Sequence, residues 1–366
     1  MSKAAELAKW GEVSTNGQVS GRRNIIINGA MQVNQRGTTD AANGNGFPVD
    51  RFKCTVAALD QFVVALSQDS SAPVGFANSL EIEVTTIEDA LATNETFVLE
   101  TRIESQDLLQ VQKGTATAKT MSLTFYVKSS VTGNYALQAL DHDNNRSVAF
   151  LYAISVADTW EKKSILIPAD TTGAFADDNG KGLALLWYLA AGTNFTSGTL
   201  QSAWAGTTSA NLAAGHNVNI MSNTDNNWFL TGVQLEVGSV ATPFEHRSFG
   251  EELALCQRYF QVAQSGTNGA ISPICNGWQQ SSGDSRGILK FPPMRAAPTI
   301  AQNTAANYFL FERNGASDNL TELSVAYSTP TSCLIYDDNT SSGTAGHGGG
   351  IYTNNASAYL HLLAEL

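Results

Sequence analysis

One segment, Val233–Phe260, constrains the fold most because it changes from the period of a strand to the period of a helix. Apolar and polar residues alternate over Val233–Val237, which predicts a half-buried strand, and Gly238 and Pro243 prevent its continuation. Beyond Ser248, apolar residues at spacings of four, three and four share one helical face: Phe249, Leu253, Cys256 and Phe260. We therefore expect a connecting helix over residues 248–260, capped by Ser248, between two β regions.

Both flanking regions carry the period-two pattern of short strands separated by turn residues, which predicts a mainly β chain. Residues 23–247 predict a jelly-roll-type β-sandwich, and residues 261–366 a second, smaller β-sandwich. The first sandwich is expected to contain strands at Asn24–Val33, Arg51–Cys54, Gln61–Leu66, Ser79–Thr85, Thr96–Ile103, Ala118–Val127, Tyr135–Leu140, Ser147–Ile154, Trp160–Ile167, Leu183–Leu189, Asn217–Ser222 and Trp228–Val237. Within the first of these strands, Gly29 predicts a bulge or a close approach of another backbone.

The beginning of the chain predicts an attachment peptide. Residues 2–10 are strong helix formers with an apolar stripe that includes Leu7 and Trp10, and a Gly/Ser/Thr/Asn-rich linker follows up to residue 22. A helix this short orders only when it packs on something, so docking on another protein is one interpretation and a frayed terminus is the other.

Composition excludes several function classes. A formal net charge of −12 with dispersed Lys and Arg argues against a nucleic-acid surface. No apolar run is long enough to predict a membrane-spanning helix, and no signal peptide is expected. The four cysteines lack metal or redox spacing; a Cys275–Cys333 disulfide stays open as an alternative to free thiols.

No cofactor is expected, although one motif raises the question of a structural calcium ion. Asp141, Asp143 and Asn145 match the opening of a calcium loop, but Arg146 stands where that loop needs glycine. Asx residues also favour plain hairpin turns, so a turn is the preferred interpretation and a structural ion near these residues the alternative.

Catalysis is not expected. Adjacent or alternating carboxylates could in principle hydrolyse glycosidic bonds, and the candidate pairs are Glu81 with Glu83, Glu251 with Glu252, and Asp337 with Asp338. None lies in a recognisable signature, and the five histidines are scattered. We therefore predict no catalytic residues, with polysaccharide cleavage as the least favoured of three functional hypotheses.

Sugar binding requires exposed aromatic rings beside amides and carboxylates, because pyranose faces stack while hydroxyls form hydrogen bonds at the ring edge. The last domain supplies such rings, and the candidate ligand-binding residues are Trp278, Tyr336 and Tyr352. Trp278 precedes a polar turn and is the best candidate for exposure. The alternative is that these rings belong to a hydrophobic core.

A co-linear series of segments resembles a β-sandwich domain of tailed-bacteriophage virion proteins, above all tail-fibre-like proteins. The segments are RNIIINGAMQVNQRGT (Arg23–Thr38), PVDRF (Pro48–Phe52), TRIESQDLL (Thr101–Leu109), SLTFYVKSSVTGNY (Ser122–Tyr135), DHDNNRS (Asp141–Ser147), VADTWEKKSILIPADTTG (Val156–Gly173), QLEVGSVATPFEHRSFGEELALCQRYF (Gln234–Phe260) and, beyond them, FPPMRAAPTI (Phe291–Ile300).

This resemblance implies a virion surface appendage, assembled in the host cytoplasm, that docks on other virion proteins through its N-terminus. It also implies a homotrimer, for which Phe249, Leu253 and Phe260 are the interface candidates; packing of this helix within one chain is the alternative. The distal domain would contact a host cell-surface glycan or protein, with no nucleic acid and no membrane insertion. A capsid or tail decoration protein is the second hypothesis.

Overall fold

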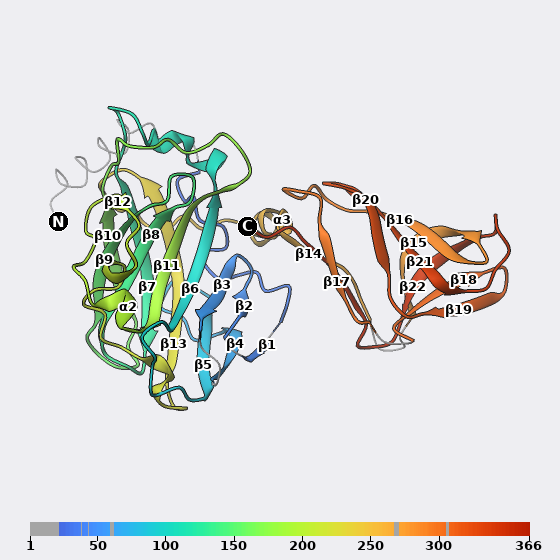
Figure 1. The fold of residues 1–366 in the computed structure, drawn as a ribbon, viewed down its shortest axis with the longest axis horizontal. Coiled ribbons are helices and arrows are strands. Elements are labelled where there is room, and N and C mark those ends of the chain that lie inside the picture. The colour runs from blue at the N-terminus through green and yellow to red at the C-terminus, as the bar shows by residue number, and fades with distance from the viewer. Residues whose placement is uncertain (1–21, 38, 43, 59–61, 267–270, 305–306) are drawn as a thin grey trace. The chain divides into compact units, whose positions relative to one another are not determined.

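The computed structural model describes residues 22–366 except 38, 43, 59–61, 267–270 and 305–306. The chain divides into two units, Met1–Glu252 with Leu366, and Leu253–Glu365 (Figure 1). Both are built from antiparallel strands with few helices, which confirms the predicted mainly β sandwich fold. The anchor candidates Leu7 and Trp10 lie outside the described residues.

Unit 1 is a sandwich of two sheets. The six-stranded sheet has the order β1 (Thr39–Ala42), β4 (Val63–Asp69), β5 (Ser79–Thr86), β13 (Asn227–Val237), β7 (Met121–Ser129) and β10 (Glu161–Ile167). The seven-stranded sheet has the order β12 (Ala205–Gly206), β9 (Arg146–Ile154), β8 (Gly133–Asp141), β11 (Lys181–Ala191), β6 (Thr96–Glu104), β3 (Phe52–Ala57) and β2 (Gly46–Val49). Inward residues of both sheets, including Phe125 and Trp187, form one continuous hydrophobic core.

Short helical segments lie in the connections of unit 1: η1 (Ser105–Val111), α2 (Thr193–Thr196), η2 (Ser209–Asn211) and η3 (Ile220–Ser222). The last of these corrects the strand expected at Asn217–Ser222. The side chain of Asn219 accepts a hydrogen bond from the backbone of Met221, and this local bond favours a helical turn over an extended strand.

The strand expected at Asn24–Val33 is also absent, because turns replace it. Asn28 and Met31 have positive φ angles, and the Asn28 side chain bonds the backbone of Val33 and Asp50. The close approach predicted at Gly29 is confirmed: a Cβ there would lie 2.1 Å from the carbonyl oxygen of Val233.

The helix α3 (Phe249–Gln257) contains the division between the units. Its predicted start and N-cap are confirmed, since the Ser248 hydroxyl accepts a hydrogen bond from the backbone of Glu251. The predicted end at residue 260 is wrong. Phe260 begins the next strand, where it pairs with Leu363, and this pairing removes it from the helical face.

Unit 2 also contains two sheets. The three-stranded sheet has the order β14 (Phe260–Ser265), β23 (Tyr359–Leu363) and β17 (Thr299–Gln302). The seven-stranded sheet has the order β19 (Ala316–Leu320), β18 (Phe309–Arg313), β22 (Gly348–Asn354), β15 (Ile271–Ser281), β16 (Gly283–Lys290), β21 (Ser332–Ser341) and β20 (Ser324–Thr329). A core of its own contains Phe309, Phe311, Ile335, Ile351 and Leu360, drawn from both sheets.

Candidate functional site

The seven-stranded sheet of unit 2 has one buried face and one face directed away from the core. Along β16, Gly287 and Leu289 take the inner positions, while Arg286 and Ile288 alternate with them on the outer side. Leu289 belongs to the core, whereas Ile288 is 52% exposed. The outer face is therefore the side of this sheet on which side chains can meet a ligand.

Strand register aligns two of the predicted ligand-binding residues on this outer face. Trp278 of β15 pairs directly with Arg286 of β16, and Arg286 pairs with Tyr336 of β21. Side chains at directly paired positions point to the same side of a sheet, and their strands lie about 4.8 Å apart. Trp278, Arg286 and Tyr336 consequently form one row across three strands, and both rings are partly exposed.

The third predicted residue, Tyr352 of β22, lies on the same face. Gly348 of β22 pairs with Trp278, and Tyr352 follows four residues later on the same side of that strand. Its ring lies over Gly350, because a Cβ there would be 2.8 Å from Cε2 of Tyr352. A Cβ at Gly348 would meet no atom within 4 Å, so the backbone of β22 is uncovered at that position.

Polar groups between the rings hold defined positions. The indole nitrogen of Trp278 donates a hydrogen bond of 2.9 Å to Oε1 of Gln280. Arg286 donates from Nε and Nη2 to the Asp284 carboxylate, the shortest of these bonds being 2.7 Å. Hydrogen bonding to Asp284 raises the pKa of Arg286, and Tyr327 and Tyr336 raise it further. We call this arrangement of Trp278, Arg286, Tyr336 and Tyr352 on the outer sheet face the aromatic face.

The aromatic face can bind a ligand that has flat apolar surfaces and carries hydroxyl groups around its edge. Aromatic rings present π-faces for stacking, and the guanidinium, carboxylate and amide groups between them offer donors and acceptors. Tyr327, 84% exposed on β20 at a positive φ, adds a further ring at the same end of the sheet as Tyr336.

Sequence reasoning missed Arg286, Asp284 and the glycines of β22. The spacing of Asp284 and Arg286 could have indicated this pair, because residues two apart on a strand lie on the same face of the sheet. Both glycines, Gly348 and Gly350, lie within β22, which covers Gly348–Asn354.

The three interface candidates occupy different environments. Phe249 is 57% exposed and Leu253 is partly exposed, whereas Phe260 is only 2% exposed. The Phe260 ring contacts that of His361 with 5.1 Å between centroids. Phe260 therefore has a packing role inside unit 2.

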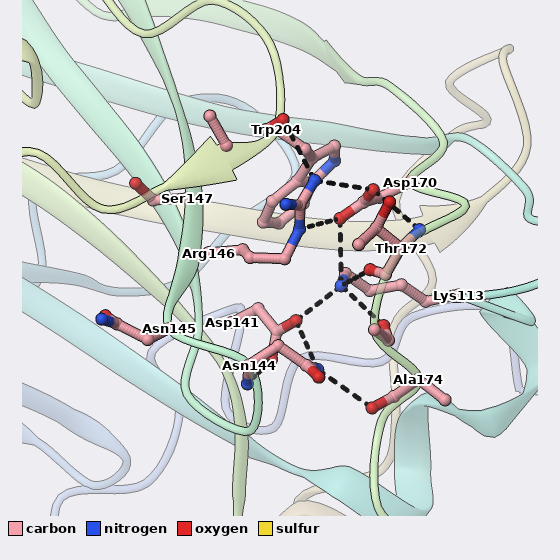
Figure 2. A network of polar contacts seen from close by, with 12 residues as sticks. Lys113, Asp141, Asn144, Asn145, Arg146, Ser147, Asp170, Thr172, Ala174 and Trp204 are labelled. Carbon is pink, nitrogen blue, oxygen red and sulfur yellow. Dashed lines mark hydrogen bonds and ion pairs between the residues drawn. The ribbon is translucent and has the colours of Figure 1, made fainter.

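Of the residues considered for calcium, Asp141 belongs to a buried ion network in unit 1 (Figure 2). The Lys113 ammonium lies 2.5 Å from Asp141 and 3.1 Å from Asp170, and Arg146 bonds the same Asp170 carboxylate at 2.8 Å. Asp141 thus faces an ammonium group. Asp143 instead accepts hydrogen bonds from Ser105 and the backbone of Ala176, so the two carboxylates do not converge. Among the residues that the structure describes, no group of three potential ligands could hold a metal ion.

Several carboxylates of the three candidate pairs bond to other residues. Glu252 accepts hydrogen bonds from the backbone of Asn28 and from Arg247, and Glu251 pairs with Arg22. Asp337 bonds Thr340. Burial raises the pKa of Glu81, as do Asp69 and Glu83. Cys275 and Cys333 form no disulfide, and neither do Cys54 and Cys256.

No helix in the described part of the chain is long and apolar enough to cross a membrane.

No protein-family model and no curated protein sequence matches the chain. Solved structures with weak similarity include the enzymatically active domain of tailspike protein 4 from bacteriophage CBA120, at 12% identity and a TM-score of 0.31, covering 58% of this chain and 21% of that one. The family 11 carbohydrate-binding module from Clostridium thermocellum has 11% identity, a TM-score of 0.27 and coverages of 56% and 98%. The tandem CBM22 domains of Paenibacillus barcinonensis Xyn10C have 10% identity, a TM-score of 0.28 and coverages of 95% and 99%. With TM-scores below 0.5, these similarities support no conclusion about function.

Proposed function

We propose that this chain is a virion appendage protein of the fibre or spike type that contacts a glycan on the host surface through the aromatic face of unit 2. The observation that carries the proposal is the strand register, which brings Trp278 and Tyr336 onto one partly exposed sheet face with Arg286 between them. The phage-like segments between Arg23 and Phe260 support the virion assignment. The mechanism is reversible stacking of sugar rings, strengthened by several copies acting together.

Binding of the full chain to an array of bacterial surface polysaccharides tests this proposal. Loss of one stacking ring should weaken binding to a responding glycan about tenfold, so Trp278→Ala and Tyr336→Ala should each show that loss. Val156→Ala is the control, because Val156 is an exposed apolar residue of unit 1 that belongs neither to the aromatic face nor to the interface candidates. Unchanged binding of both variants would contradict glycan contact at this face.

The same preparation separates the alternatives. A decoration protein would bind virion components and no polysaccharide on the array. A depolymerase would release reducing ends from a bound polysaccharide, whereas the proposed function predicts binding without such release. Sedimentation of the full chain tests the trimer, and variants Phe249→Ala and Leu253→Ala should weaken it if α3 forms the interface.

A further inference from the structure

A groove in unit 1 lies on the side of the six-stranded sheet that faces away from the core. Its floor consists of residues from three neighbouring strands, Tyr126 of β7, Lys162 of β10 and Gly232 of β13, and its wall is the segment Ala241–Phe244. The groove has a volume of about 350 Å³. Sites for small ligands begin at about 300 Å³, so one sugar-sized molecule fits.

Buried polar residues hold the wall of the groove in place. The Glu236 carboxylate accepts hydrogen bonds of 2.7 Å from both the backbone nitrogen and the hydroxyl of Thr242. Gln234 donates to Glu236 and accepts a bond of 2.7 Å from the backbone of Glu245. Glu236 and Gln234 are 1% and 0% exposed. Their hydrogen bonds hold the wall in place before a ligand binds, so binding need not order this segment.

The floor presents an aromatic ring. Tyr126 packs against Phe76 with 5.4 Å between ring centroids, and Phe76 in turn contacts Phe244 of the wall at 4.9 Å. Gly232 has a φ of +62°, and a Cβ there would lie 2.7 Å from Phe76 and 2.9 Å from Tyr126. The rings can therefore take these positions only above a glycine.

The groove also carries positive charge. Lys162 is exposed and its ammonium lies 5.7 Å above the Tyr126 ring, but it forms no ion pair with any residue that the structure describes. Its neighbour Lys163, by contrast, is paired with Glu161 at 2.5 Å. Arg23 does not line the groove; its Nη1 donates to the Thr242 hydroxyl at 2.8 Å, and that hydroxyl in turn donates to Glu236. In a chain with a net charge of −12, a lysine at an aromatic groove without an ion pair in the described part of the chain favours an anionic ligand.

We propose that this groove binds an acidic sugar, a pyranose that carries a carboxylate. The carboxylate pairs with Lys162, one ring face stacks on Tyr126, and a hydroxyl reaches Thr124, which also lines the groove. Two carboxylates lie behind the wall: Glu236 accepts hydrogen bonds from Thr242 and Gln234, and Glu245 accepts them from the backbone of Arg23 and Asn24. Glu236 belongs to β13, and β7 separates that strand from the Lys162 strand β10. This site is separate from the aromatic face and does not rest on the function proposed for unit 2.

Calorimetric titration of the full chain with sodium D-glucuronate and with D-glucose tests the proposal. A charge-assisted bond should make glucuronate bind about tenfold more tightly than glucose, and added NaCl should reduce that preference. Lys162→Ala should abolish the preference and Lys162→Arg should retain it. Lys163→Ala is the matched control, because Lys163 is a lysine on the same strand. Trp278→Ala tests whether glucuronate binds at the aromatic face instead. Neither variant should change the affinity for glucuronate.

Three results would overturn the inference. These are equal affinity for the two sugars, glucuronate binding that Lys162→Ala leaves unchanged, and no saturable glucuronate binding at all. Because Lys162 is exposed, its replacement should leave folding intact, and the unfolding midpoint of each variant checks this directly.

Discussion

The ammonium group of Lys113 is buried and ion-paired, and only 2% of the Lys113 side chain is exposed. Two aspartates and two backbone carbonyl groups, those of Thr172 and Gly173, surround its ammonium. The bonds join the 111–119 loop to the β8–β9 hairpin and to the 168–175 loop (Figure 2). Removing one partner from a buried pair leaves an uncompensated charge.

Lys113→Met should therefore lower the free energy of unfolding by about 3–5 kcal/mol, measured by urea denaturation at pH 7. Lys162→Met, a change at an exposed lysine, should stay within about 0.5 kcal/mol of the unchanged protein. Equal stability of the two variants would show that the network adds nothing to the fold.

His216 makes stability depend on pH. Burial lowers the pKa of His216 from 6.5 to about 4, so the folded state holds the ring neutral. The unfolded chain then binds more protons below pH 6.5, and stability falls as the pH drops from 6.5 towards 4. The loss should be about 2–3 kcal/mol between pH 7 and pH 4.5, and His216→Gln should remove most of that pH dependence.

Urea midpoints at the two pH values measure this effect. Burial also lowers the pKa of His142, which contributes in the same direction. A comparison of His216→Gln with His142→Gln therefore separates the two histidines, and a pH dependence that both variants retain in full would refute the assignment.

At the scale of elements, the segment before β1 shows how a backbone contact replaces a predicted strand. Val233 donates a hydrogen bond of 2.8 Å to the carbonyl group of Gly29, and Asn24 bonds the Val233 carbonyl group. Residues 24–33 thus dock on β13 through turns and side-chain bonds. Apolar alternation alone cannot distinguish this arrangement from a strand.

Gly29→Ala should destabilise unit 1 by about 1–3 kcal/mol, because the added methyl group collides with a carbonyl oxygen that cannot move without disturbing β13. Gly206→Ala is the control, since a Cβ at that position meets nothing within 4 Å. Thermal unfolding compares the two variants, and similar midpoints would contradict the close approach.

The aromatic face depends on the register in which β15, β16 and β21 pair. Sequence reasoning selected Trp278, Tyr336 and Tyr352, but their separation in sequence says nothing about their spatial relation. A shift of β16 by one residue would move Arg286 to the core side, so the row depends on pairing that packing of both sheets decides.

At the scale of the whole molecule, each unit has a separate hydrophobic core. We expect two unfolding transitions in calorimetry of the full chain. Phe311→Ala removes a fully buried ring from the core of unit 2 and should cost about 3–5 kcal/mol, lowering one transition and leaving the other in place. A single transition that moves as a whole would show that the units unfold together.

The sequence by itself determined most of the period-two strands of the first sandwich, the N-cap of α3 at Ser248 and the aromatic residues available for binding, because these depend on local spacing and capping. Only the tertiary structure decided that Phe260 leaves the helix for β14, that Asp141 faces Lys113, and that Trp278 and Tyr336 share a row. Each of these three contacts joins residues that are distant in the chain. Local periodicity does not specify which distant residues pair, because strand pairing and core packing select them.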